Sequence, residues 1–271
     1  MDGKHLARAL RQGTRVYGTL IVSNSPRWPA AVKATGVDFV FIDTEHVAID
    51  RTTLAWMCET YKALDLAPVV RIPEPDPFLA CMALDGGASG VLAPYIEKPE
   101  QVQKLRGAVK LRPVKGAVLE RALYNGRQLP GDTQSYVDRR NEGNVLMLNI
   151  ESTPALENLD EILSVPGVDA VQVGPHDLSC SLGVPEQYTD PLFLEKIEFI
   201  IATARRHGVG AGIHFWESFD QELAWAKLGA NLIMHSADIT LFTKKLREDL
   251  DRFRETLDGA ASAKTLLEAE I

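Results

Sequence analysis

The order of strand-like and helix-like segments predicts an α/β fold, a single (β/α)8 TIM barrel that spans residues 1–271. Eight short runs rich in aliphatic and β-branched residues alternate with helical patterns from about residue 16 to residue 257. Strands that alternate with helices pair in parallel through right-handed crossovers, and eight such units most simply close into a barrel. The length of 271 residues is typical of this architecture and long for one sandwich or bundle.

The expected elements follow one another with clear start and stop signals. The predicted strands are Val16–Val22, Phe39–Asp43, Val69–Ile72, Gly90–Ala93, Val145–Ile150, Ala170–Gly174, Gly210–Phe215 and Leu232–His235. The helical stretches between them include Thr52–Leu64, Pro77–Gly86, Pro99–Val109, Pro154–Ser164, Pro191–His207 and Ser218–Leu228. Several open with Pro, Ser or Thr, as helices commonly do. A doubly wound open sheet is the alternative, but it usually has a Gly-rich turn after its first strand, where this chain has Ser23-Asn24-Ser25-Pro26.

Three segments depart from the regular alternation. Residues 111–144 are polar, rich in Arg, Gly and Asn, and show little periodicity, which predicts a long loop acting as a lid, an interface or only a surface excursion. The segment Leu241–Leu257 predicts a last helix with one apolar stripe that must pack on something. The tail, residues 258–271, is expected to be frayed or weakly helical.

Composition predicts a soluble cytoplasmic enzyme. The chain is 45% hydrophobic with a formal net charge of −8, and its basic residues are scattered, which argues against nucleic acid or an anionic membrane as partner. Three cysteines without ligand-like spacing indicate reduced thiols. No apolar run approaches the roughly 20 residues that span a bilayer, and the N-terminus does not resemble a signal peptide.

Two carboxylates stand where successive strands stop being hydrophobic. Glu151 follows Val145–Ile150, and Asp177 follows Ala170–Gly174. In a parallel barrel the chemistry lies at the carboxyl ends of the strands, and a hard divalent cation needs anionic oxygens that converge from a rigid scaffold. Either residue alone could equally well cap the helix that follows it. The two together favour a metal site.

Other strand ends carry an arginine and several histidines. Arg71 could clamp a substrate carboxylate or enolate oxygen, or it could pair with a structural carboxylate. His46 is a candidate proton carrier, with Asp43 near enough in sequence to orient its ring, although a structural histidine is the alternative. Three further histidines are each as easily polar wall residues as participants: His176, His214 and His235.

Five motifs give the chain a resemblance to the HpcH/HpaI family of class II, metal-dependent pyruvate aldolases. They are Phe41-Ile42-Asp43-Thr44-Glu45-His46, Pro68-Val69-Val70-Arg71, Leu84-Asp85-Gly86-Gly87-Ala88, Asn149-Ile150-Glu151-Ser152 and Val173-Gly174-Pro175-His176-Asp177-Leu178-Ser179. The resemblance implies that Glu151 and Asp177 bind Mg²⁺, Mn²⁺ or Co²⁺. It implies that Arg71 stabilises the enolate, and that His46, held by Asp43, assists proton transfer. The substrate-binding residues that it implies are Arg71, Asn149, Gly174, Pro175 and His176.

The resemblance also implies a homo-oligomer, a trimer or a hexamer, in which the last helix is exchanged between subunits. Asn149 and His176 depart from the residues common in the family and lie near the presumed aldehyde site, so the aldehyde is left open. No lysine falls at a strand end, where a Schiff base would need it, because Lys33, Lys62, Lys104 and Lys227 all fall in helical stretches.

We therefore expect a metal-dependent carbon–carbon lyase that reversibly cleaves a 4-hydroxy-2-oxo acid into pyruvate and an aldehyde. One alternative is a CoA-ester lyase of the citryl- or malyl-CoA type on the same barrel. That enzyme would need a groove for the adenine nucleotide, commonly basic, and the sequence shows no clear one. The other alternative is a non-catalytic barrel that binds a partner through its loops, which leaves the charged strand ends unexplained.

Overall fold

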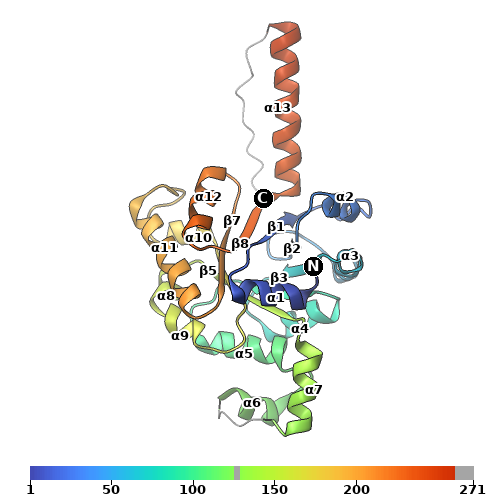
Figure 1. Ribbon diagram of the computed structural model, residues 1–271, viewed down its shortest axis with the longest axis vertical. Helices are drawn as coiled ribbons and strands as arrows, with labels where there is room; N and C mark the ends of the chain where they lie inside the picture. Colours follow the sequence, from blue (N-terminus) through green and yellow to red (C-terminus); the bar gives the residue numbers. More distant parts are fainter. Residues whose placement is uncertain (125–128, 260–271) are drawn as a thin grey trace.

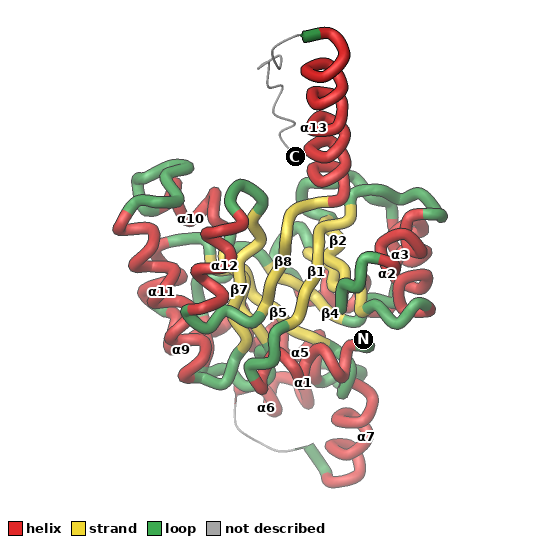
Figure 2. The backbone as a smooth tube through the Cα atoms, turned by 45° about the horizontal axis from the view of Figure 1, so that its top comes forward, coloured by secondary structure: helices red, strands yellow, loops and turns green. Residues whose placement is uncertain are grey.

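The computed structural model describes residues 1–124 and 129–259 and shows a closed barrel of eight parallel strands. Each strand pairs with the next, and β8 pairs with β1 to close the ring, as Figure 2 shows. The strands are β1 (Val16–Ile21), β2 (Phe39–Asp43), β3 (Ala67–Arg71), β4 (Gly90–Ala93), β5 (Val145–Ile150), β6 (Ala170–Val173), β7 (Gly210–Phe215) and β8 (Leu232–Ala237). The predicted barrel is confirmed, and the strand ends agree to within two residues.

Helices surround the barrel on most sides (Figure 1). They are α1 (Gly3–Gln12), α2 (Trp28–Ala34), α3 (Arg51–Ala63), α4 (Pro77–Asp85), α5 (Pro99–Lys110), α6 (Gly116–Tyr124), α7 (Gly131–Asn141), α8 (Thr153–Glu157), α9 (Leu159–Leu163), α10 (Pro175–Ser181), α11 (Pro191–Arg206), α12 (Phe219–Lys227) and α13 (Asp238–Asp258). The stretch expected as one helix from Pro154 to Ser164 is two short helices, which meet at Asn158.

The core has two shells, as the alternation of side chains along a strand requires. One shell fills the barrel interior and includes Phe41, Leu92 and Met147. The other lies between the strands and the helices. Helix α1 contacts β1, β3, β5 and β7 and buries Leu6 and Leu10 in the interior cluster, so it closes the N-terminal end of the barrel. The opposite, C-terminal end is left for the site.

Residues 111–144 are not the long loop that their composition predicts. They contain α6 and α7, and residues 125–128 between these helices lie outside the described part of the chain. Leu111, Leu123, Leu129 and Val137 form a small apolar cluster of their own. Few apolar side chains therefore suffice to hold two largely exposed helices, and this explains the weak periodicity. In Figure 1 the pair extends below the barrel.

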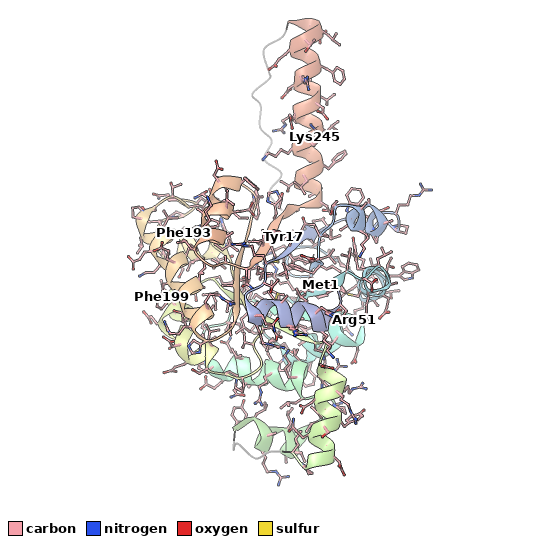
Figure 3. The ribbon with its side chains drawn as sticks, viewed as in Figure 1. Met1, Tyr17, Arg51, Phe193, Phe199 and Lys245 are labelled. Carbon is pink, nitrogen blue, oxygen red and sulfur yellow. The ribbon has the colours of Figure 1, made fainter. Side chains whose placement is uncertain are left out.

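The last helix, α13, projects away from the barrel and does not fold over it (Figure 1). Its apolar side chains are exposed, with Phe242 at 59%, Phe253 at 62% and Leu257 at 74% exposure. The outer side of β1 and β8 is also bare in Figure 2, and Tyr17, labelled on β1 in Figure 3, is 52% exposed. Of the predicted frayed tail, residues 258–271, only Asp258 and Gly259 lie within the described residues. In the described residues, no helix is both long and apolar enough to cross a membrane.

Candidate active site at the C-terminal mouth of the barrel

The strand-end residues that the sequence singles out meet at one end of the barrel. Asp43 ends β2 and Arg71 ends β3, and the two residues are paired in the parallel register. Glu151 directly follows β5, and Asp177 lies in the first turn of α10, after β6. The charges of Arg71 and Asp177 both act on the pKa of Glu151, so the three groups lie within electrostatic range of one another.

Arg71 is held in place by two carboxylates. Its Nε donates to Asp43 Oδ1 at 2.8 Å and its Nη2 to Asp43 Oδ2 at 2.5 Å, while Nε also lies 3.2 Å from Glu45 Oε2. The guanidinium carbon lies 5.5 Å from the centre of the Phe41 ring. Burial acts to lower the pKa of Arg71, but the hydrogen bonds and charge of Asp43 outweigh it and raise that pKa above its ordinary value. The guanidinium is therefore a fixed positive charge.

Asp43 binds Arg71, whereas the sequence predicted that Asp43 orients the ring of His46. Burial acts to raise the pKa of Asp43, but the bonds from Arg71 outweigh it and the pKa is lowered. Its Oδ1 also accepts from the Glu45 backbone N–H at 2.9 Å. His46 is half-exposed, and its Nε2 lies 3.9 Å from Glu45 Oε2. Within the described residues, the carboxylate of Asp43 makes its hydrogen bonds to Arg71 and Glu45, and His46 acts on its pKa through charge alone.

Glu151 is a buried carboxylate whose negative charge is unfavourable in its surroundings. Its Oε1 accepts from the Tyr95 backbone N–H at 2.6 Å, and its Oε2 accepts from Asn149 Nδ2. Burial raises the pKa of Glu151 to about 7. The hydrogen bond from Tyr95 and the charge of Arg71 act to lower this pKa, while the charges of Asp177 and Glu45 act to raise it. An uncompensated buried carboxylate of this kind is stabilised by a cation.

The surroundings of Glu151 fit a divalent ion held by few protein ligands. A Cβ at Gly174 would lie 2.8 Å from Glu151 Oε2, so glycine leaves the room that this oxygen needs. Asn149 Oδ1 is buried without a hydrogen-bond partner among the described residues. No group of three or more His, Cys, Asp or Glu side chains within that part of the chain could hold a metal. Glu151 and Asp177 are therefore the two candidate carboxylate donors, and a divalent ion there would need substrate or water to complete its shell.

The other predicted residues separate into those at the mouth and those away from it. Gly174 and Pro175 begin α10, and Pro175 is buried there. His176 is exposed, and its Nδ1 lies 3.5 Å from Glu186 Oε1. His214 is buried near Arg71, and its Nε2 lies 2.9 Å from the Ser236 carbonyl oxygen. Burial lowers the pKa of His214 to about 4, so this ring is neutral at physiological pH.

His235 lies on the other side of its strand. The neighbouring residue Met234 points into the barrel, so His235 points outward, and its Nδ1 lies 2.7 Å from Glu222 Oε2. The hydrogen bond to Glu222 raises the pKa of His235. We therefore place this histidine outside the site.

Two residues that the sequence reasoning did not assign belong to the site. Glu45 contacts Arg71, and a hydrogen bond between its carboxylate and the Tyr95 hydroxyl raises the pKa of that phenol to about 12. Tyr95 also binds Glu151 through its backbone. Glu45 was visible within the Asp43–His46 motif, and Tyr95 follows Pro94 at the end of β4, so position alone could have suggested both.

The fold and sequence match one family over most of the chain. A family model described as HpcH/HpaI aldolase/citrate lyase matches residues 17–244. A 2-keto-3-deoxy-L-rhamnonate aldolase from Salmonella gallinarum is 33% identical over 262 residues, which cover 94% of each chain. The crystal structure of an HpcH/HpaI aldolase from Desulfitobacterium hafniense has a TM-score of 0.80 at 26% identity, covering 92% of this chain and 96% of that one. That of the citrate synthase SbnG has a TM-score of 0.79 at 26% identity, covering 93% and 98%.

The family model extends over the strands that carry the charged residues of the mouth. The sequence placed four lysines in helices, and the structure agrees: they are Lys33 in α2, Lys62 in α3, Lys104 in α5 and Lys227 in α12. The prediction of a carbon–carbon lyase is confirmed: the chain belongs to the HpcH/HpaI aldolase/citrate lyase family and is an enzyme of the aldolase kind.

Proposed function

We propose that this enzyme is a metal-dependent aldolase that reversibly cleaves a 4-hydroxy-2-oxo acid into pyruvate and an aldehyde. The observation that carries the proposal is the meeting of Glu151, Asp177 and a fixed Arg71 at the mouth of the barrel. The relative from Salmonella gallinarum supports it, because 2-keto-3-deoxy-L-rhamnonate, which gives that aldolase its name, is a 2-oxo acid that lacks oxygen at C3. Cleavage next to such a carbon leaves an enolate of pyruvate, which needs positive charge around its oxygen.

Glu151 and Asp177 are the residues that would hold the divalent ion. Their oxygens are hard ligands that suit Mg²⁺, Mn²⁺ or Co²⁺. The ion, when bound, supplies a Lewis acid beside the 2-oxo acid. The proton on Glu151, whose pKa is about 7, must leave before the carboxylate can act as a ligand.

Arg71 is placed to stabilise negative charge on the substrate oxygen. Its Nε and Nη2 are engaged by Asp43, and within the described residues no hydrogen bond engages Nη1. Nη1 is therefore available to a substrate oxygen, and the pairing with Asp43 fixes the plane in which it donates. Because the guanidinium is already oriented, little reorganisation is needed as the enolate forms.

His46 is proposed to carry the proton that the enolate receives at C3. The ring is half-exposed, so it can exchange protons with solvent, and an imidazole is the side chain best suited to proton transfer near neutral pH. Asn149, beside Glu151, together with Gly174, Pro175 and His176 at the start of α10, is proposed to line the substrate.

Calorimetric titration of pyruvate tests this function. We expect binding in the presence of Mg²⁺ or Mn²⁺ and loss of binding after chelation, because the metal carboxylates hold the 2-oxo acid only through the ion. A CoA-ester lyase on the same barrel predicts binding of acetyl-CoA in its place. The Asp177→Ala variant is the control, since it should behave like the chelated enzyme. Pyruvate binding that is unchanged by chelation would refute the proposal.

We also propose a homo-oligomer, a trimer or a hexamer, in the cytoplasm. In most (β/α)8 barrels a last helix covers the final strands, but here α13 points away and leaves the outer side of β1 and β8 bare (Figures 1 and 2). The apolar stripe of α13 and this bare surface each need a cover, and a second copy of the chain offers both. Light scattering should show a hexamer. Phe253→Glu should dissociate it while Lys245→Glu, on the same helix, should not, and a monomer at micromolar concentrations would refute this.

A further inference from the structure

Tyr95 has a backbone conformation that few residues other than glycine adopt. It follows β4 with a φ of 53°, in the left-handed region. The surrounding contacts hold it there: its N–H donates to Glu151 Oε1 at 2.6 Å, and its carbonyl oxygen accepts from Gln101 Nε2 at 2.9 Å. A strained backbone that binds a functional carboxylate is a common feature of active sites.

The loop that carries Tyr95 is firmly tied to its surroundings. Gln101 Oε1 accepts from the backbone N–H groups of Glu97 and Lys98, at 2.8 and 2.9 Å. The Glu97 side chain in turn accepts from Ser152 Oγ at 2.8 Å, one residue after Glu151. These bonds connect the loop after β4 to the loop after β5, so the position of Tyr95 is fixed relative to Glu151.

The side chain of Tyr95 reaches from one part of the site to another. Its backbone binds Glu151, while its hydroxyl reaches Glu45, which lies 3.2 Å from Arg71 Nε. Tyr95 is 55% exposed, whereas Arg71 and Glu151 are largely buried. The phenol therefore lies at the outer rim of the mouth, between the buried charges and solvent.

A substrate bound at the buried charges must extend past this rim. In the proposed function the pyruvyl part lies against Arg71, Glu151 and Asp177, so C4 and the atoms beyond it point outward. We propose that the Tyr95 hydroxyl hydrogen-bonds the C4 oxygen of the substrate, an inference that rests on the proposed function. A phenol both donates and accepts, so it matches an oxygen that is a hydroxyl before cleavage and a carbonyl after it.

This contact would make Tyr95 a catalytic residue of the aldehyde half of the reaction. The hydroxyl has one proton, which it shares with Glu45 in this structure, and it would turn that proton to the C4 oxygen when substrate binds. Its effect should be strongest when negative charge develops on the C4 oxygen, because a hydrogen-bond donor stabilises that charge. The enolate half, which involves the protons of the pyruvate methyl group, should not depend on it. The two halves can be measured separately.

The test is Tyr95→Phe, which removes the hydroxyl and keeps the backbone bond to Glu151. With Mn²⁺ present, NMR follows exchange of the pyruvate methyl protons with deuterium, and a second assay follows aldol addition. The aldehyde is whichever of glycolaldehyde and glyceraldehyde the unmodified enzyme adds faster. We expect kcat/KM for addition to fall roughly 10- to 100-fold, as for loss of one hydrogen bond in a polar site, while exchange stays within about twofold. Tyr136→Phe, on exposed α7, is the matched control.

The outcomes separate this inference from the function on which it rests. Addition at the unmodified rate in Tyr95→Phe would overturn the role of the hydroxyl. An equal fall in exchange and addition would also overturn it, because the hydroxyl would then serve the enolate or the metal carboxylates. Absence of exchange in the unmodified enzyme would instead refute the proposed function, and this inference would fall with it.

Discussion

In the metal-free enzyme, replacing Glu151 by Gln should stabilise the fold at pH 8 much more than at pH 5. The negative charge of Glu151 is unfavourable in the folded protein. Burial and the nearby charges of Asp177 and Glu45 raise the pKa of Glu151 from 4.5 to about 7. The folded state therefore binds a proton more tightly than the unfolded state. Since stability falls with pH wherever the folded state holds more protons, wild-type stability should decline between pH 4.5 and 7 and level off above.

The size of the effect follows from the two pKa values. Each unit of difference corresponds to about 1.4 kcal/mol, so the charged Glu151 costs about 3 kcal/mol at pH 8. At pH 5 most of the carboxylate is still protonated in the folded state, and the same relation gives a cost of about 1 kcal/mol. The amide of Gln carries no charge and so has neither of these costs, and the gain in stability from the substitution should be larger at pH 8 than at pH 5 by about 2 kcal/mol.

The amide also has hydrogen-bond needs, but these do not vary with pH in this range. Glu151 accepts from both Tyr95 and Asn149, and Gln can accept at only one oxygen. A half-turn of the Asn149 amide would present its unpartnered Oδ1 to the new NH2 group. Any cost in hydrogen bonding lowers the free energy of unfolding of the variant by the same amount at pH 5 and pH 8. The change in the variant's advantage between the two pH values therefore reports the charge of Glu151 alone.

Urea unfolding in the presence of a chelator, at one protein concentration, measures the effect. Wild type and Glu151→Gln are compared at pH 5 and pH 8, with the exposed Glu157→Gln as the matched control. The control should show no such pH dependence, because its carboxylate is in water in both states. A stability difference between variant and wild type that is the same at both pH values would refute the reasoning. It would mean that Glu151 is no harder to ionise in the fold than in the unfolded chain.

The remaining predictions concern activity. Asp177→Ala should abolish metal binding and activity while leaving the fold intact; calorimetric retention of Mn²⁺ binding would remove it from the ligand set. Arg71→Lys should lose at least about 100-fold in kcat, because Lys cannot donate to Asp43 and substrate in one plane; a rate within a few-fold of wild type would leave Arg71 with a structural role. His46→Ala should still bind Mn²⁺ and pyruvate but should exchange the pyruvate methyl protons roughly 10²–10⁴-fold more slowly by NMR, and unchanged exchange would exclude it as the proton carrier.

The barrel was predictable because its signals are local and repeated. Each strand is a short apolar run between a helix stop and a polar loop, and burial on both faces of a parallel sheet makes such runs conspicuous. The exceptions have a common cause. The helices α6 and α7 bury only a few side chains each, such as Leu123 and Val137, so their periodic signal is too weak to separate them from a polar loop. The direction of α13 was not predictable either, because its stripe shows that a cover is needed but not where the cover lies.

The sequence predicted which residues lie at the site better than it predicted which of them are in contact. Parallel strands bring their carboxyl ends together, so the sequence could place Asp43, Arg71, Glu151 and Asp177 at one mouth. It could not predict that the strain at Tyr95 directs a backbone N–H onto Glu151, since a left-handed conformation at a tyrosine depends on the contacts around it.

The pairing of Asp43 illustrates what decides between contacts that sequence leaves open. His46 is three residues away along the chain, and proximity in sequence suggested that Asp43 orients its ring. Arg71 is 28 residues away but lies opposite Asp43 in the register of β2 and β3, and its planar group matches both carboxylate oxygens at once. A two-bond charged pair in a buried place outweighs a single bond to a half-exposed imidazole. We therefore expect Asp43 to act on the reaction through the orientation of Arg71, while the carboxylate that lies nearest the His46 ring in the ion pairs of the site is that of Glu45, at 3.9 Å.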